Sequence, residues 1–254
     1  MTQTKKQGLS LTIVGLVILV AGAVSFGLFR TASDLAFALC LIGILLGAVV
    51  AGCGLAAIGT KEEHKTDTKK LVLAAMMAAL CYIGFTFFKI DIAVGSEKTA
   101  FHLGNVFCVL AALLLGGMWG GLAGAVGMTV ADLTTAYVTS APKTFLLKLG
   151  IGLIVGLVAH KGFKLSKATE PKKITVATVV SSIAGMAFNI VADPVVGYFY
   201  KTYLLGVPQD AAKIWAKIGA LTTTVNAVIA VVVASIAYLA LRPALKKAKL
   251  FPEV

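Results

Sequence analysis

The sequence predicts an all-α membrane protein of eight transmembrane helices with both termini in the cytoplasm. Hydrophobic residues make up 59% of the 254 residues and charged residues only 13%, whereas a soluble domain carries about 25% charged residues. The apolar residues are gathered in runs close to the ~20 residues that a helix needs to cross a bilayer. The basic residues are concentrated in alternate segments between these runs, which indicates a fixed orientation in the membrane.

Eight apolar runs define the predicted helices. They are residues 8–29, 35–58, 71–88, 103–117, 118–138, 145–160, 174–192 and 218–241. The first run follows Lys5 and Lys6, which would also suit a secretory signal, but its 22 residues exceed the ~7 to 15 of a signal's apolar region. After the seventh run, Pro194 ends the helix or kinks it, so the segment to Leu205 either extends that helix or folds over its outer end.

The distribution of basic residues predicts the orientation. Fifteen of the 23 lysines and arginines lie at the N-terminus, in the segments around residues 61–70 and 161–173, and after residue 241. By the positive-inside rule these segments face the cytoplasm, so both termini are cytoplasmic and the number of spans is even.

The polar segment 61–70 divides the chain into unequal parts. We expect a two-helix membrane extension over residues 1–60, a cytoplasmic linker over 61–70 and a six-helix substrate-binding membrane domain over 71–247. The alternative is an ordinary cytoplasmic loop within a single eight-helix bundle.

Sequence motifs for the common catalytic chemistries are absent. The chain contains no G-x-x-x-x-G-K-[ST], no H-E-x-x-H and no G-x-S-x-G. The four cysteines lie inside apolar runs without C-x-x-C spacing. Of the three histidines, His64 and His160 lie at the predicted cytoplasmic face and His102 at the outer face, so they cannot form one site. We therefore expect no enzyme activity, catalytic residue, metal or cofactor, and no nucleic acid as a partner.

Polar side chains within the predicted spans form the candidate substrate-binding site. Such groups are costly inside a bilayer and are usually functional. The candidates are Asn105, Asp132, Lys148, Asn189, Asp193 and Asn226. At ~1.5 Å per residue all six fall in the outer half of the membrane, and a polar group of residues open on one side suits the capture of an extracellular solute.

Structural roles are the alternative for several of these residues. Asp132 and Lys148 reach a similar depth on consecutive helices and could form a buried ion pair. Asn189 and Asn226 could instead hydrogen-bond between helices. The connection from Lys89 to Phe101 is either a lid over the site or a solvated loop.

Small residues indicate where helices approach closely. In the third predicted helix, Ala74 with Ala78 and Ala75 with Ala79 form two small-x-x-x-small pairs, which suit a partner surface or internal packing. The glycines of the fifth and sixth predicted helices are expected to pack internally.

These segments resemble the substrate-binding S components of energy-coupling factor (ECF) vitamin transporters, in the branch that includes riboflavin-type S components. The resemblance runs from about Lys69 to Lys247. It rests on LVLAAMMAAL at 71–80, LLLGGMWGGLAG at 113–124, ADL at 131–133, PKTFLLK at 142–148, GLIVG at 152–156 and VN at 225–226.

The resemblance implies a six-helix fold that binds a vitamin or related micronutrient at its outer face, with the loop after the first core helix closing over it. It implies docking through Ala74, Ala75, Ala78 and Ala79 onto a membrane T component attached to two cytoplasmic ATPases, in a bacterial plasma membrane. Toppling of the S component would then release the solute inside. The two helices before Gly59 depart from the six-helix pattern.

The sequence thus favours a binding subunit of an importer. The alternatives are a self-sufficient secondary transporter that couples solute uptake to protons through Asp132 and Asp193, and a scaffold protein without transport. The candidate site mixes one cation, two carboxylates and three amides. Both acids, such as pantothenate or lipoate, and neutral or cationic vitamins, such as riboflavin or pyridoxamine, therefore remain candidate substrates.

Overall fold

The structure is a computed structural model that describes residues 9–10, 12–18, 68–95 and 97–248. The chain divides into two compact units. One comprises Met1–Asp67 and Asp132–Pro142, and the other, which we call the bundle unit, comprises Thr68–Ala131 and Lys143–Val254. Residues 12–18 are helical, whereas the second predicted helix lies outside the described residues. Of the predicted linker 61–70, residues 61–67 also lie outside them, and residues 68–70 are helical.

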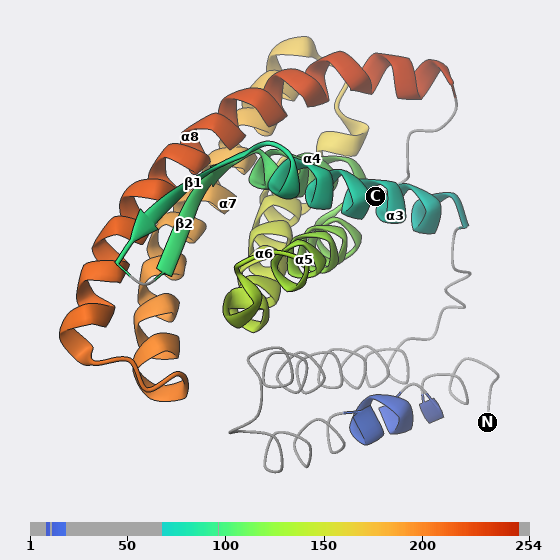
Figure 1. Ribbon diagram of the computed structural model, residues 1–254. Coiled ribbons are helices and arrows are strands. Elements are labelled where there is room, and N and C mark those ends of the chain that lie inside the picture. The colour runs from blue at the N-terminus through green and yellow to red at the C-terminus, as the bar shows by residue number, and fades with distance from the viewer. Residues whose placement is uncertain (1–8, 11, 19–67, 96, 249–254) are drawn as a thin grey trace. The chain divides into compact units, whose positions relative to one another are not determined.

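The described part of the chain after residue 67 contains the α-helices α3 to α8, which Figure 1 labels. They are α3 (Thr68–Thr86), α4 (Gly104–Leu115), α5 (Gly117–Leu133), α6 (Ala141–Gly156), α7 (Pro171–Phe199) and α8 (Gln209–Lys247). Within the described part of the chain, four helical segments are long and apolar enough to cross a membrane: Lys69–Thr86, Val138–Gly162, Pro171–Leu204 and Gln209–Lys247. The prediction of a multi-pass helical membrane protein is confirmed, and the count of eight spans stays a prediction.

The last two helices are longer than the apolar runs indicated. Helix α7 continues through Pro194 to Phe199 and then into a π-helical turn, Tyr200–Leu204, because a proline removes only one intrahelical hydrogen bond when its neighbours remain helical. Helix α8 begins at Gln209, nine residues before the predicted start at Ile218. Asp210 in its first turn favours this start, since a negative charge stabilises a helix N-terminus.

The connection between α3 and α4 is a β-hairpin. Strand β1 (Lys89–Val94) pairs with the antiparallel strand β2 (Glu97–His102), in a register that runs from Lys89 opposite His102 to Val94 opposite Glu97. Gly95 lies in the turn with φ +62°, a conformation that glycine adopts at no steric cost. The sequence analysis described this segment as a loop, so the hairpin is an addition to the predicted fold.

Close glycine contacts join α5 to α6. A Cβ atom added at Gly152 would overlap the backbone of Gly121, and one at Gly156 would overlap the backbone of Gly117. Such pairs let two helix backbones approach closely in lipid, where packing contacts rather than hydrophobic burial drive association. The expectation that these glycines pack internally is confirmed.

Helix α4 supplies the centre of the bundle unit. Every residue of this helix except Phe107 is buried, and Val109, Leu113, Ile151 and Met186 are at most 1% exposed in the core around it. Because other helices cover α4 on all sides, it does not need the length of a lipid-facing span.

Candidate functional site

The register of α6 against α7 brings two predicted site residues to one level. Gly185 packs on the backbone of Ile151, and further toward the predicted outer end the Lys143 ammonium lies 2.7 Å from the Asp193 carboxylate. These two contacts show that the helices run antiparallel. Lys148, on the turn before Ile151, therefore lies at the level of Asn189, on the turn after Gly185.

The register of α7 against α8 adds a third residue to this level. Ser235 Oγ lies 3.4 Å from Ser182 Oγ, and Thr223 Oγ1 donates a 2.7 Å hydrogen bond to Asp193 Oδ2. Between these contacts, the antiparallel register places Asn226 at the level of Asn189.

Helix α4 completes what we call the polar layer: Asn105, Lys148, Asn189 and Asn226. Lys148 Nζ donates a 2.7 Å hydrogen bond to Asn105 Oδ1. All four side chains are buried, with exposed fractions of 1%, 7%, 1% and 4% in that order. Four buried polar side chains from four helices are unusual in a membrane interior and mark a candidate site.

An ion pair lies about one helical turn further out. Asp193 accepts hydrogen bonds from Lys143 and Thr223, one on each carboxylate oxygen and both 2.7 Å long. The two charged side chains retain 16% and 22% of their exposure. Asp193 is therefore neutralised by a residue that the sequence analysis had not selected.

The β-hairpin is fastened to α8 at the polar layer. Asn226 Oδ1 accepts a 3.0 Å hydrogen bond from the His102 backbone N–H, and Asn226 Nδ2 donates a 3.0 Å bond to the Ala100 carbonyl. The amide thus bonds the free edge of β2 as a neighbouring strand would. Thr99 and Thr222 add a hydroxyl hydrogen bond of 3.1 Å, and Figure 1 shows the hairpin alongside α8.

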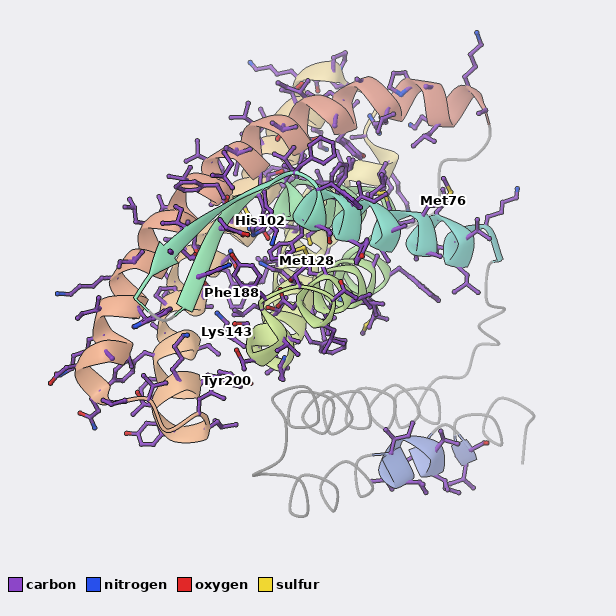
Figure 2. The ribbon with its side chains drawn as sticks, in the orientation of Figure 1. Met76, His102, Met128, Lys143, Phe188 and Tyr200 are labelled. Carbon is purple, nitrogen blue, oxygen red and sulfur yellow. The ribbon has the colours of Figure 1, made fainter. Side chains whose placement is uncertain are left out.

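His102 lies under the hairpin as a neutral ring. Its Nδ1 accepts a 3.1 Å hydrogen bond from the Gly104 N–H, and its ring contacts Phe85 edge to face at 4.8 Å. Burial, and then the positive charge of Lys148, lower the pKa of His102 from its ordinary 6.5 to about 3. Figure 2 labels the side chains of His102, Phe188 and Lys143, which appear in that order from top to bottom of the view.

Apolar packing closes the layer on its inner side. Ile151, Met186 and Ala230, each about one turn below a polar-layer residue, are at most 1% exposed. The site is thus a set of hydrogen-bonding groups with a packed floor and a hairpin fastened across it. This arrangement suits the binding of a small polar molecule.

The structure brings five of the six predicted binding residues together in the bundle unit: Asn105, Lys148, Asn189, Asp193 and Asn226. Asp132 belongs to the other unit, where it is 3% exposed and its backbone oxygen accepts a 3.5 Å hydrogen bond from Thr135 Oγ1. Its predicted partnership with Lys148 therefore stays a prediction.

Sequence reasoning missed Lys143, Thr223 and the backbone of β2. Lys143 lies in the quoted segment 142–148 and Thr223 in a run of three threonines just before Val225-Asn226. Those positions, within a turn of selected residues, were the available signal.

The two alanine pairs lie on different faces of α3. Ala74 is buried in the core, and Ala78 is half-buried, with its carbonyl where a Cβ on Gly127 would overlap it. Ala75 and Ala79 are exposed. The sequence analysis treated the four as one docking set, whereas the structure places one pair toward the bundle and one pair away from it.

Comparisons with known proteins found a matching family and a similar solved structure. The family described as "ECF-type riboflavin transporter, S component" matches residues 65–243, which is more than half of the chain. A crystal structure of the S component for biotin from an ECF-type ABC transporter aligns with a TM-score of 0.49 and 16% identity, over 69% of this chain and 94% of that one. No curated protein matches the sequence. The length of the family match shows that the chain belongs to the family of ECF-type riboflavin transporter S components.

Proposed function

We propose that this protein is the membrane-embedded substrate-binding subunit of an ECF-type importer. It captures a vitamin or related micronutrient outside the cell and delivers it inward with energy from separate ATPase subunits. The polar layer carries this proposal, because its four buried polar side chains, next to a hairpin that Asn226 bonds, supply hydrogen-bonding groups for a small molecule. Family membership supports a transporter subunit rather than an enzyme.

The hairpin acts as the outer cover of the site in this proposal. The predicted topology puts residues 89–102 on the outer side of a bacterial plasma membrane. Two hydrogen bonds from Asn226 and one between Thr99 and Thr222 fasten β2 to α8, and the proposal is that these bonds break when solute enters. The packed floor at Ile151 and Met186 keeps the solute from leaking inward before a partner acts.

Docking onto a membrane T component with two cytoplasmic ATPases is proposed to use the exposed face of α3. Ala75 and Ala79 lie there beside Val72 and Met76, which are 52% and 57% exposed. Two small residues four apart allow a partner helix to approach closely. Ala74 and Ala78 instead support α3 on its own bundle.

The opposed alanine pairs supply a matched test. Leucine at both Ala75 and Ala79 should leave thermal stability and solute binding unchanged but abolish co-purification with the co-expressed T component and ATPases, together with ATP-driven uptake. Leucine at both Ala74 and Ala78 should overpack the bundle and lower stability by about 1 to 3 kcal/mol per site. Normal association and uptake in the Ala75/Ala79 variant would contradict docking on this face.

A further inference from the structure

The charges of the candidate site are unequal, and the excess is positive. In the bundle unit, Lys143 is paired with Asp193, and His102 is neutral because its pKa lies near 3. Lys148 is 7% exposed, and among the described residues it forms no salt bridge; its hydrogen-bond partner is the neutral oxygen of Asn105. With Lys148 as an ammonium, these side chains of the bundle unit carry one more positive than negative charge.

A buried ammonium without a counter-ion is costly. An ionised group loses its hydration on burial and is normally compensated by an opposite charge. Lys148 Nζ has three N–H donors, and the printed hydrogen bond to Asn105 uses one of them. A ligand that brings an anionic group would supply both the missing charge and the missing acceptors.

Asn189 gives independent evidence for a ligand in the same layer. Its side chain is 1% exposed, and its Oδ1 has no hydrogen-bond partner among the described residues. Buried polar atoms are nearly always bonded, so an unbonded one at the level of Lys148 indicates a missing donor. A substrate with an N–H or O–H group would provide that donor.

We propose that the substrate is a small organic acid whose carboxylate binds Lys148 Nζ and whose N–H or O–H group donates to Asn189 Oδ1. This assignment rests on the proposed function and names the substrate class of that site. A carboxylate rather than a phosphate fits, because one net positive charge balances a monoanion and leaves a phosphate dianion uncompensated.

Matched pairs of compounds test the assignment on the full-length protein in detergent. Calorimetry would compare pantothenate with pantothenol, lipoate with lipoamide, and nicotinate with nicotinamide, with pyridoxal phosphate as a phosphate probe and riboflavin as an uncharged probe. At least one carboxylate should bind, and its uncharged partner should bind about 30-fold more weakly or worse, as expected when one member of a buried charge pair is removed.

Three variants separate a binding role of Lys148 from a structural one. Asn105→Asp places a carboxylate of nearly the same shape beside Lys148, where it should keep thermal stability and weaken the acid about 30-fold or more while sparing the uncharged partner. Lys148→Met should also remove the preference for the acid. Lys217→Met removes an exposed lysine outside the layer and should change nothing.

Three results would overturn the proposal: riboflavin or an uncharged partner binding as tightly as the acid, undiminished acid binding by Asn105→Asp, or no binding of any carboxylate probe. An ion pair between Lys148 and Asp132 predicts the first of these. Failure here stays distinct from failure of the proposed function, because an importer of an uncharged vitamin would still take up that vitamin only when the T component and ATPases are present.

Discussion

Replacing Asn226 by alanine tests whether the hairpin is held closed from α8. The structure assigns both polar atoms of this side chain to β2, one to the His102 N–H and one to the Ala100 carbonyl. The substitution removes both bonds and leaves the two backbone groups facing a methyl group. Because the His102 amide is bonded to Asn226, its exchange with solvent reports directly on this attachment.

The magnitude follows from the two groups that lose their partners. A partly buried donor and a buried acceptor left unbonded cost about 1 to 3 kcal/mol each, with the lower half of this range suited to the more accessible His102 N–H. A total of about 2 to 5 kcal/mol corresponds to opening that is ~30- to ~4000-fold more frequent. Solute should dissociate faster by a similar factor if release requires this opening.

Hydrogen exchange resolved at the peptide covering residues 97–102 is the suitable assay. Thr99→Val is the matched control, because it removes one partly buried hydrogen bond to Thr222. It should lower the free energy of opening by only the ~0.5 to 1.5 kcal/mol of a single hydrogen bond, and so raise the exchange rate less than Asn226→Ala does. Unchanged exchange of the His102 amide in Asn226→Ala would refute the attachment. Unchanged solute dissociation with faster exchange would show that the hairpin is not the exit.

Two further predictions concern packing and pH. Gly152→Ala should lower the unfolding free energy by about 1 to 3 kcal/mol, because the added Cβ atom overlaps the backbone of Gly121. Gly219→Ala in α8 is the control: nothing lies within 4 Å of its added Cβ atom, so it should be neutral or stabilising by up to about 1 kcal/mol. Equal midpoints of thermal unfolding for the two variants would count against the glycine contact. The pKa of His102 in the folded protein, about 3, lies below its unfolded value of 6.5, so its contribution to stability is complete above pH 6.5. The unfolding free energy should therefore fall by up to about 1.4 kcal/mol for each pH unit between pH 6.5 and 3. His102→Asn keeps an acceptor for the Gly104 N–H and should reduce this dependence of stability on pH in thermal scans from pH 8 to 4.5. An unchanged dependence in the variant would exclude His102 as the cause.

The helices after residue 67 were predictable because each contains an apolar run, and a bilayer allows few other structures for such a run. The residues at which α7 ends and α8 begins were not predictable. Helix α7 passes through Pro194 and α8 begins at Gln209, where polar residues such as Asp210 and Lys213 interrupt the apolar pattern. Backbone hydrogen bonds continue there without a hydropathy signal.

The hairpin had a signal that was not used. Ile90, Ile92 and Val94 alternate with other residues ahead of a glycine turn, which is a strand pattern. A lid or a solvated loop was the expectation for the connection from Lys89 to Phe101. Two short strands rarely form alone, and here the Asn226 amide, distant in sequence, bonds the edge of β2.

The placement of these polar residues at similar depth was predictable, but their hydrogen-bond partners were not. Depth in the membrane identified Asn105, Lys148 and Asn226, yet it does not reveal that Asn226 bonds backbone atoms of the hairpin. Similarly, the two alanine pairs of α3 lie one residue apart, and a helix that is apolar on all sides gives no indication of which face meets a partner. Only the packing of Ala74 and the exposure of Ala75 separate the faces.

Reconstituted transport tests the central claim most directly. The purified chain would be placed in proteoliposomes alone, with an imposed proton gradient, or together with its T component and ATPases supplied with ATP. The uptake of a molecule identified by mass spectrometry as co-purifying with the chain would then be measured. The account predicts that this molecule binds the isolated chain and enters only when the partners and ATP are present. Uptake by the chain alone, driven by the proton gradient, would contradict it.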